Sequence, residues 1–302
     1  MSVAVFFNLI RYKNLLLLIY FQLLIKYLLF PAFNIVEVFS SIQFIIFLLA
    51  LVCITAAGNI INDIFDVEID KVNKPNTYIV SRLISKEKAK RLYLFVNSIG
   101  VISGIYLSLN IQKPQYSFIF ITVSLLLYYY SKKIKGTLLL GNIIVSFLIA
   151  LSVYLLAIFN ISNKTLIENS LYVKIILLLY TIFAFFINFS REIIKDIQDI
   201  IGDYKLKLNT LPISIGIKRS KSIIAISCFI VLSLLLFLTL TFAEYYKYTF
   251  LYLLLFSFLP LFYISIQILK STTNKDFKKI SLLLKIIMLF GVSSIILLSF
   301  KL

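Results

Sequence analysis

Residues 38–62 read VFSSIQFIIFLLALVCITAAGNIIN, and DIFDVEID follows immediately at 63–70. The first stretch is long and apolar enough for a helix that crosses a bilayer, which needs roughly 20 mostly apolar residues. The second stretch places four acidic side chains within eight positions. Together they predict a membrane-spanning helix that ends in a cluster of carboxylates.

Eight further apolar stretches flank this one and predict eight more spans. The nine predicted spans cover residues 15–33, 38–62, 91–111, 116–131, 137–159, 171–190, 222–243, 248–269 and 281–300. The composition agrees, because 61% of the 302 residues are hydrophobic and only 14% are charged, whereas soluble domains carry about 25% charged residues. We therefore expect an all-α polytopic membrane protein, with residues 1–302 forming one domain, and exclude a water-soluble globule.

The positive charges alternate between the two ends of these spans. Of 30 Lys and Arg residues, 23 fall on one side and five on the other, while Lys26 and Lys285 lie within spans. Because cytoplasmic connections collect Lys and Arg, we expect a cytoplasmic N-terminus. The long polar connections at about 63–90 and 191–221 then also face the cytoplasm. The net charge of +17 thus reports orientation, and no nucleic-acid partner is expected.

Several classes of chemistry are excluded by residue usage. The sequence has no His, which rules out imidazole acid–base steps, Ser-His-Asp triads and His-ligated zinc. The two cysteines, Cys53 and Cys228, both fall in apolar runs and form no motif. Catalysis must therefore depend on carboxylates, cations, hydroxyls and amides.

The 13 acidic residues are concentrated in two windows, each at the cytoplasmic end of a span. Eight of them are Asp63, Asp66, Glu68, Asp70, Glu192, Asp196, Asp199 and Asp203. The same i, i+3, i+7 spacing of aspartates occurs in both windows, and it stacks carboxylates on one face of a helix. Stacked carboxylates repel one another unless cations offset them. Mg²⁺ is usually held by one or two carboxylates and substrate phosphate oxygens, so the windows indicate a magnesium–diphosphate site.

The motif Asn62-Asp63-x-x-Asp66-x-x-x-Asp70 resembles the N-D-x-x-D-x-x-x-D motif of the UbiA superfamily of intramembrane prenyltransferases. Asp196-x-x-Asp199-x-x-x-Asp203 resembles that family's second aspartate motif. The segment from Tyr130 to Lys135, followed by Gly141-Asn142, is similar to its Tyr/basic connection. The resemblance covers roughly residues 10–300. It implies an integral protein of the cell or inner membrane in which nine helices surround a prenyl-binding cavity, and transfer of a prenyl group from an allylic diphosphate to a membrane-associated acceptor.

The resemblance also implies roles for individual residues. Metal–diphosphate binding is assigned to Asn62, Asp63, Asp66, Asp70, Asp196, Asp199 and Asp203, with Mg²⁺ as the cofactor. Of these, Asp66, Asp70, Asp199 and Asp203 are expected to be catalytic, together with Tyr130. The candidate cations for the diphosphate are Lys74, Arg82, Lys133 and Lys135.

One stretch departs from the family pattern, in which an Arg-Pro pair followed by Ser-Gly usually comes after the first motif. Here Lys74-Pro75-Asn76-Thr77 leads to Ser81-Arg82, so that Thr77 occupies the usual Arg position and Arg82 the Gly position. If the usual Arg contacts diphosphate, Lys74 or Arg82 must replace it.

The acceptor is predicted from residues 191–213. Arg191-Glu192 through Gly202-Asp203 to Thr210-Leu211-Pro212-Ile213 resembles the digeranylgeranylglyceryl phosphate synthase branch, which alkylates a glycerol-phosphate ether lipid with a geranylgeranyl group. Arg191 and Lys195 lie one helical turn apart, and we expect them to hold the acceptor phosphate.

Two other functions stay open. The first is prenyl transfer to an aromatic acceptor of quinone biosynthesis, because those branches share the aspartates. The second is an ion-coupled transporter, although transporter sites usually lie near the bilayer midplane on broken helices. The prenyl chain length and the oligomeric state are not predicted.

Overall fold

The computed structural model describes residues 2–300, and these residues form helices, turns and two isolated bridges. Within this part of the chain, eight helices are long and apolar enough to cross a membrane. Their bounds are Tyr12–Ala32 (α2 to α3), Ser41–Phe65 (α4), Lys86–Asn110 (α6), Leu140–Asn160 (α8), Ile167–Lys205 (α9), Ile217–Phe242 (α11), Lys247–Lys270 (α12 to α13) and Asn274–Ser299 (α14). The all-helical membrane fold is thus observed.

The fourth predicted span, 116–131, is also helical but shorter than the others. It corresponds to α7, Ser117–Tyr129, which continues into a π-helical turn at Tyr130–Ile134. Each of the nine predicted spans therefore matches a helix, and α7 is the one below the length of a full crossing. Shorter helices are α1 (Val3–Leu9), α5 (Val67–Asn73) and α10 (Leu211–Ile215).

Polar residues set the starts of several long helices. Ser40 accepts a hydrogen bond from the backbone of Gln43, whose side chain accepts from the Ser40 N–H in return. Thr273 and Asp276 form the same reciprocal arrangement at the start of α14. Such capping boxes satisfy N–H groups that have no partner within the helix.

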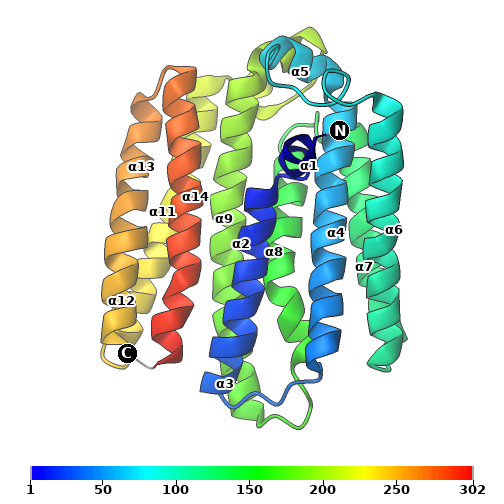
Figure 1. The fold of residues 1–302 in the computed structure, drawn as a ribbon. Helices are drawn as coiled ribbons and strands as arrows, with labels where there is room; N and C mark the ends of the chain where they lie inside the picture. The colour runs from blue at the N-terminus through cyan, green and yellow to red at the C-terminus, as the bar shows by residue number, and fades with distance from the viewer. Residues whose placement is uncertain (1, 301–302) are drawn as a thin grey trace. The chain divides into compact units, whose positions relative to one another are not determined.

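The chain divides into two compact units, and α2 (Tyr12–Leu24), α8 and α9 each contribute residues to both. The first contains the described residues up to Tyr20, together with Val38–Gly141 and Ile201–Leu208; the second contains Phe21–Glu37, Asn142–Ile200 and the described residues from Asn209 onward. In the first unit, α4 packs along α6 and both contact α7, as Figure 1 shows. In the second, α11 packs on α13, and α14 contacts α12 and α13.

The two predicted cytoplasmic connections are more helical than expected. In the first, α4 reaches Phe65 and α5 begins at Val67, so that only Asp66 and residues 74–85 lie outside the helices. In the second, α9 continues without a break through Lys205, and the segment 191–205 is helix rather than loop. The segment 191–205 is helical because its sequence is amphipathic. Ile193, Ile194 and Ile197 are buried on one face, while the acids occupy other positions.

Candidate active site

The first aspartate motif lies where α4 passes into α5. The backbone N–H of Asp66 donates to the carbonyl of Asn62 over 2.9 Å, and that of Asp70 donates to the carbonyl of Asp66 over 2.8 Å. These i to i−4 bonds keep the three residues one helical turn apart through the junction. The Asn62 amide also donates to Asp66 Oδ2 over 2.6 Å. The predicted stacking of this face is therefore present.

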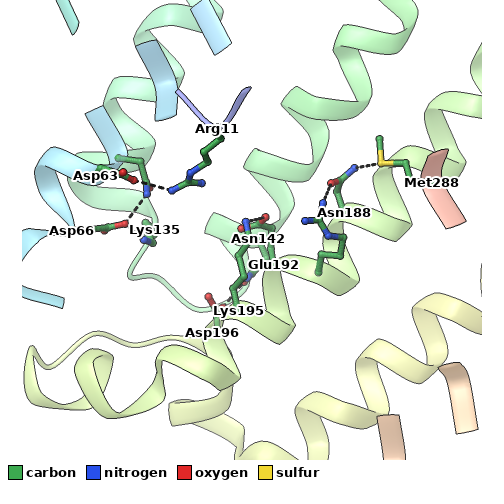
Figure 2. A network of polar contacts seen from close by, with 12 residues as sticks. Arg11, Asp63, Asp66, Lys135, Asn142, Asn188, Glu192, Lys195, Asp196 and Met288 are labelled. Atoms are coloured by element: carbon green, nitrogen blue, oxygen red, sulfur yellow. Dashed lines mark hydrogen bonds and ion pairs between the residues drawn. The ribbon is translucent and has the colours of Figure 1, made fainter. Parts of the chain in front are cut away.

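Every acid of this motif meets a cation within the first unit, and Figure 2 shows the pairs of Asp63 with Arg11 and of Asp66 with Lys135. Arg11 Nη2 lies 2.8 Å from Asp63 Oδ1, Lys135 pairs with Asp66, and Lys74 Nζ lies 3.0 Å from Asp70 Oδ1. Lys71 also pairs with Glu68 at 2.8 Å, and this hydrogen bond raises the pKa of the lysine. Four cations thus offset the repulsion that stacked carboxylates would otherwise create.

Asp66 is the most enclosed of these acids, with only 6% of its surface exposed. Lys135 reaches it from the turn after α7, 69 residues away in sequence. The Lys135 N–H donates to the Tyr130 carbonyl over 2.9 Å, an i to i−5 bond that widens the turn. Such π-turns are frequent at functional sites. The turn thus presents a cation to the central carboxylate of the motif.

Gly141 lets this turn fold back closely on itself. A Cβ at position 141 would lie 3.0 Å from the Ile134 carbonyl oxygen and 3.1 Å from Lys135 Cα. Both neighbours are backbone atoms, which cannot swing aside as a side chain does. The Gly that follows the basic segment therefore helps to fix where Lys135 lies.

The remaining predicted cations and Tyr130 are placed less centrally. Lys133 is exposed on the same π-turn, and Arg82 is exposed and donates to the Asn76 carbonyl in its own loop. Tyr130 is buried, whereas the neighbouring Tyr128 packs on Phe65. Burial thus separates Tyr130 from the half-buried Tyr128. The ion pair with Asp66 separates Lys135 from Lys133.

The second aspartate motif lies on one continuous helix, α9. Within the second unit, Asn142 Nδ2 donates to Asp196 Oδ2 over 2.8 Å, and Asp199 is half-buried one turn further on. Asp203 is buried and lies in the last turns of α9, in the part of the helix that belongs to the first unit. The amide of Asn142 therefore orients one carboxylate of this motif as Asn62 does in the first.

The predicted acceptor-binding cations, Arg191 and Lys195, precede this motif on α9, and Figure 2 shows Lys195 beside Glu192. Arg191 Nη1 donates to Asn188 Oδ1 over 3.3 Å, and the Asn188 amide donates to the Ala184 carbonyl over 2.8 Å. Lys195 Nζ lies 2.5 Å from Glu192 Oε1. Asn188 thus fixes the orientation of the guanidinium, while Glu192 balances the charge of Lys195.

Sequence reasoning missed Arg11 and Asn188. Arg11 counted only as one of the cations on the cytoplasmic side, although it pairs with Asp63; its backbone is left-handed, with φ 54°, which the sequence does not signal. Asn188 had a signal, because it is a polar residue inside an apolar span and such residues face protein partners.

The donor set fits a magnesium ion. Among residues 2–300, no group of three acidic or cysteine side chains is gathered closely enough to enclose a metal. Mg²⁺ does not require such a cage, since it is usually held by one or two carboxylates together with water and substrate phosphate oxygens. The Asp66 carboxylate and the Asn62 amide, which are in direct contact, supply the hard oxygen ligands that this ion prefers.

A polytopic helical membrane protein with paired aspartate motifs at helix ends is the class that fold and site define. The model of the UbiA prenyltransferase family matches residues 23–290. The chain therefore belongs to the UbiA prenyltransferase family, and the predicted family and enzyme class are confirmed.

Individual relatives agree with this assignment. The digeranylgeranylglyceryl phosphate synthase of Sulfurisphaera tokodaii is 32% identical over 221 residues, which is 73% of this chain and 73% of that protein. A solved structure described as digeranylgeranylglyceryl phosphate synthase in membranes has a TM-score of 0.65 and 23% identity, with 99% of each chain covered. A UbiA homologue from Archaeoglobus fulgidus bound to DMAPP and Mg²⁺ has a TM-score of 0.56 and 16% identity, covering 96% of this chain and 98% of that one. The two structures confirm the predicted fold.

Proposed function

We propose that this prenyltransferase moves a geranylgeranyl group from its allylic diphosphate to the hydroxyl of a prenylglycerol phosphate, in ether-lipid biosynthesis. The observation that carries the proposal is the pairing of Asp63, Asp66 and Asp70 with three cations. Carboxylates for a metal and cations for phosphate oxygens are thereby gathered at one helix junction. The name of the S. tokodaii relative supports the choice of acceptor.

The metal-binding residues in this proposal are Asn62, Asp63, Asp66 and Asp70 of the first motif and Asp196, Asp199 and Asp203 of the second. When bound there, Mg²⁺ neutralises the negative charge that develops on the departing diphosphate. The A. fulgidus homologue bound to DMAPP and Mg²⁺ supports this choice of metal and of donor class.

Lys135 and Lys74 have a second role once the diphosphate is bound. Each lysine pairs with an aspartate, so both ammonium groups lie beside the carboxylates that would hold the metal. From there they would donate to the phosphate oxygens and stabilise the charge that forms as the C1–O bond breaks. Arg82 and Lys133, both exposed, are the further candidates for diphosphate binding, and Tyr130 is the candidate hydroxyl.

The reaction balances without an oxidant or reductant. The allylic C1–O bond breaks, its electron pair leaves with the pyrophosphate, and the acceptor oxygen forms the new C–O bond. The acceptor loses its hydroxyl proton, so that the products are the ether, pyrophosphate and a proton. Apolar side chains around the prenyl group are needed, because water would capture the allylic cation.

The acceptor phosphate is assigned to Arg191 and Lys195. Asn188 orients the Arg191 guanidinium, and a guanidinium binds two phosphate oxygens at once with good geometry. The Lys195 ammonium forms an ion pair with Glu192, so that Arg191 is the stronger phosphate ligand of these two cations. The charge distribution along the chain supports an active site that faces the cytoplasm, with the N-terminus on the same side.

A competition experiment tests this proposal. The purified protein is given geranylgeranyl diphosphate and Mg²⁺ with equal amounts of a prenylglycerol phosphate and an aromatic acid, and the products are separated by mass spectrometry. We expect the ether lipid and no prenylated aromatic acid. A prenylated aromatic product identifies the quinone branch instead, and turnover that persists in excess EDTA contradicts the metal assignment.

A further inference from the structure

The C-terminal end of α9 is hydrogen-bonded to the end of α5, which follows the first motif. The Gly202 N–H donates to Asn73 Oδ1 over 3.0 Å, although the two residues are 129 positions apart. Both belong to the first compact unit. Asn73 ends α5, one helical turn after Asp70, and Gly202 directly precedes Asp203. One hydrogen bond therefore joins the residue one turn after Asp70 to the residue directly before Asp203.

A side chain at position 202 would displace the Asn73 side chain. A Cβ there would lie 2.5 Å from Asn73 Nδ2 and 2.9 Å from Asn73 Cγ. Real carbon atoms do not approach so closely, so even alanine would push the asparagine side chain away. The glycine in the second motif thus allows the backbone of α9 to reach the Asn73 amide.

A second contact holds the same segment. A Cβ at Gly136, directly after Lys135, would lie 2.8 Å from Leu208 Cδ2. Leu208 itself follows α9, and its N–H donates to the Asp203 carbonyl over 2.9 Å. Residues 201–208 therefore contact both the end of α5, which carries Asp70, and the turn that carries Lys135.

We propose that Asn73 is a positioning residue, whose hydrogen bond to Gly202 holds the Asp203 end of α9 in register with the first aspartate motif for metal–diphosphate binding. Asn73 touches no reacting atom in this role and acts through the placement of Asp203. The inference rests on the proposed function, because it assumes that both motifs serve one magnesium–diphosphate site.

The test measures binding rather than turnover. Full-length protein in detergent is titrated with geranylgeranyl thiodiphosphate, an analogue that resists ionisation, at a series of Mg²⁺ concentrations in a calorimeter. Loss of one hydrogen bond is worth about 1 kcal/mol, or somewhat under tenfold in a binding constant. We therefore expect Asn73→Ala to raise the Mg²⁺ concentration for half-maximal analogue binding by roughly fivefold to tenfold. Asn76→Ala changes an exposed asparagine in the loop directly after α5, serves as the matched control and should leave this Mg²⁺ concentration unchanged.

A double variant tests the contact itself. Gly202→Ala should impair Mg²⁺-dependent binding and lower the Tm, because the added methyl group collides with the Asn73 amide. In Asn73→Ala/Gly202→Ala that collision is gone, so the double variant should resemble Asn73→Ala alone. Penalties that simply add would show that the two residues are independent and would overturn the proposal.

The remaining outcomes are distinguishable. If Asn73→Ala lowers the Tm but leaves the Mg²⁺ midpoint unchanged, the residue is only structural and the positioning role is wrong. If the wild-type protein binds no analogue in the presence of Mg²⁺, the proposed function fails together with this inference. If the wild type binds and the Asn73→Ala curve superimposes on it, only the positioning role fails.

Discussion

Lys135 forms an ion pair with Asp66, and the Asn62 amide donates to the same carboxylate oxygen, Asp66 Oδ2. The central acid of the first motif is therefore held by a neighbour on its own helix and by a cation from a turn 69 residues away. A carboxylate that is almost fully buried requires such partners, because an unpaired buried charge is strongly destabilising.

Replacing Lys135 by methionine should reduce the rate of prenyl transfer more than substrate binding. The ammonium group matters most when negative charge builds up on the departing pyrophosphate, and removing one such electrostatic partner typically lowers kcat by about 100-fold. Steady-state kinetics at saturating Mg²⁺ measure this. Lys132→Met is the control, since Lys132 is exposed on the same turn, and an equal loss in both variants would argue for a general effect on the turn.

Asp66→Asn and Asp199→Asn should each abolish activity, with kcat/KM reduced by roughly 1,000-fold or more, because an amide is a weaker ligand for Mg²⁺ than a carboxylate. EDTA should inactivate the wild type and excess Mg²⁺ should restore it. Glu244→Gln removes an exposed acid elsewhere in the chain and should behave as wild type. Full activity in either aspartate variant would falsify the assignment of that residue to the metal.

Gly141→Ala should impair catalysis by moving Lys135. The new methyl group would press on the backbone at Ile134 and Lys135, so the turn must shift and the lysine with it. We expect lower kcat and a modest loss of stability. Gly58→Ala provides the comparison, since its methyl group would meet only the flexible end of the Leu127 side chain, at 2.9 Å. Loss of stability without loss of kcat in Gly141→Ala would contradict this reasoning.

The spans and both motifs were predictable because their signals are local. Apolar runs of about 20 residues indicate helices, and the spacing of Asn62, Asp66 and Asp70 indicates one helix face whatever the rest of the chain does. The continuation of α9 to Lys205 was also present in the sequence, as an amphipathic repeat of isoleucines. The polar composition of 191–221 hides the end of this helix, because it resembles that of a loop.

The pairing of the charges was not predictable, because packing decides it. Packing gives Asp63, a predicted metal ligand, Arg11 as its partner from a position 52 residues earlier. It also directs the guanidinium of Arg82, a predicted diphosphate cation, to the Asn76 carbonyl. No periodicity or local motif connects residues so far apart, or states which of several cations a carboxylate will meet.

Arg191→Ala should weaken binding of the phospholipid acceptor while leaving the affinity for the prenyl diphosphate unchanged. A hydrogen bond to a charged group is worth about 1.5–3 kcal/mol, which corresponds to roughly a 10- to 100-fold higher acceptor KM. Arg191→Lys should recover part of the loss. Arg219→Ala removes an exposed arginine of the same unit and is the control; a similar KM change in both variants would indicate a general electrostatic effect.

Replacing Lys26, which lies far from the aspartate motifs in sequence, should lower the stability of the protein. It lies in a π-helical turn of the first span, is almost fully buried, and pairs with Glu37, which also accepts a 2.6 Å hydrogen bond from Asn160 Nδ2. Lys26→Met leaves the Glu37 carboxylate without its cation, and breaking a buried pair costs about 3–5 kcal/mol. Because a quarter of the Glu37 side chain is exposed, we expect the lower end of that range and a clearly reduced Tm. Lys26→Met/Glu37→Gln removes both charges and should recover much of the stability, since the glutamine oxygen still accepts from Asn160. A double variant less stable than Lys26→Met alone would show that the ion pair is not the source of the effect.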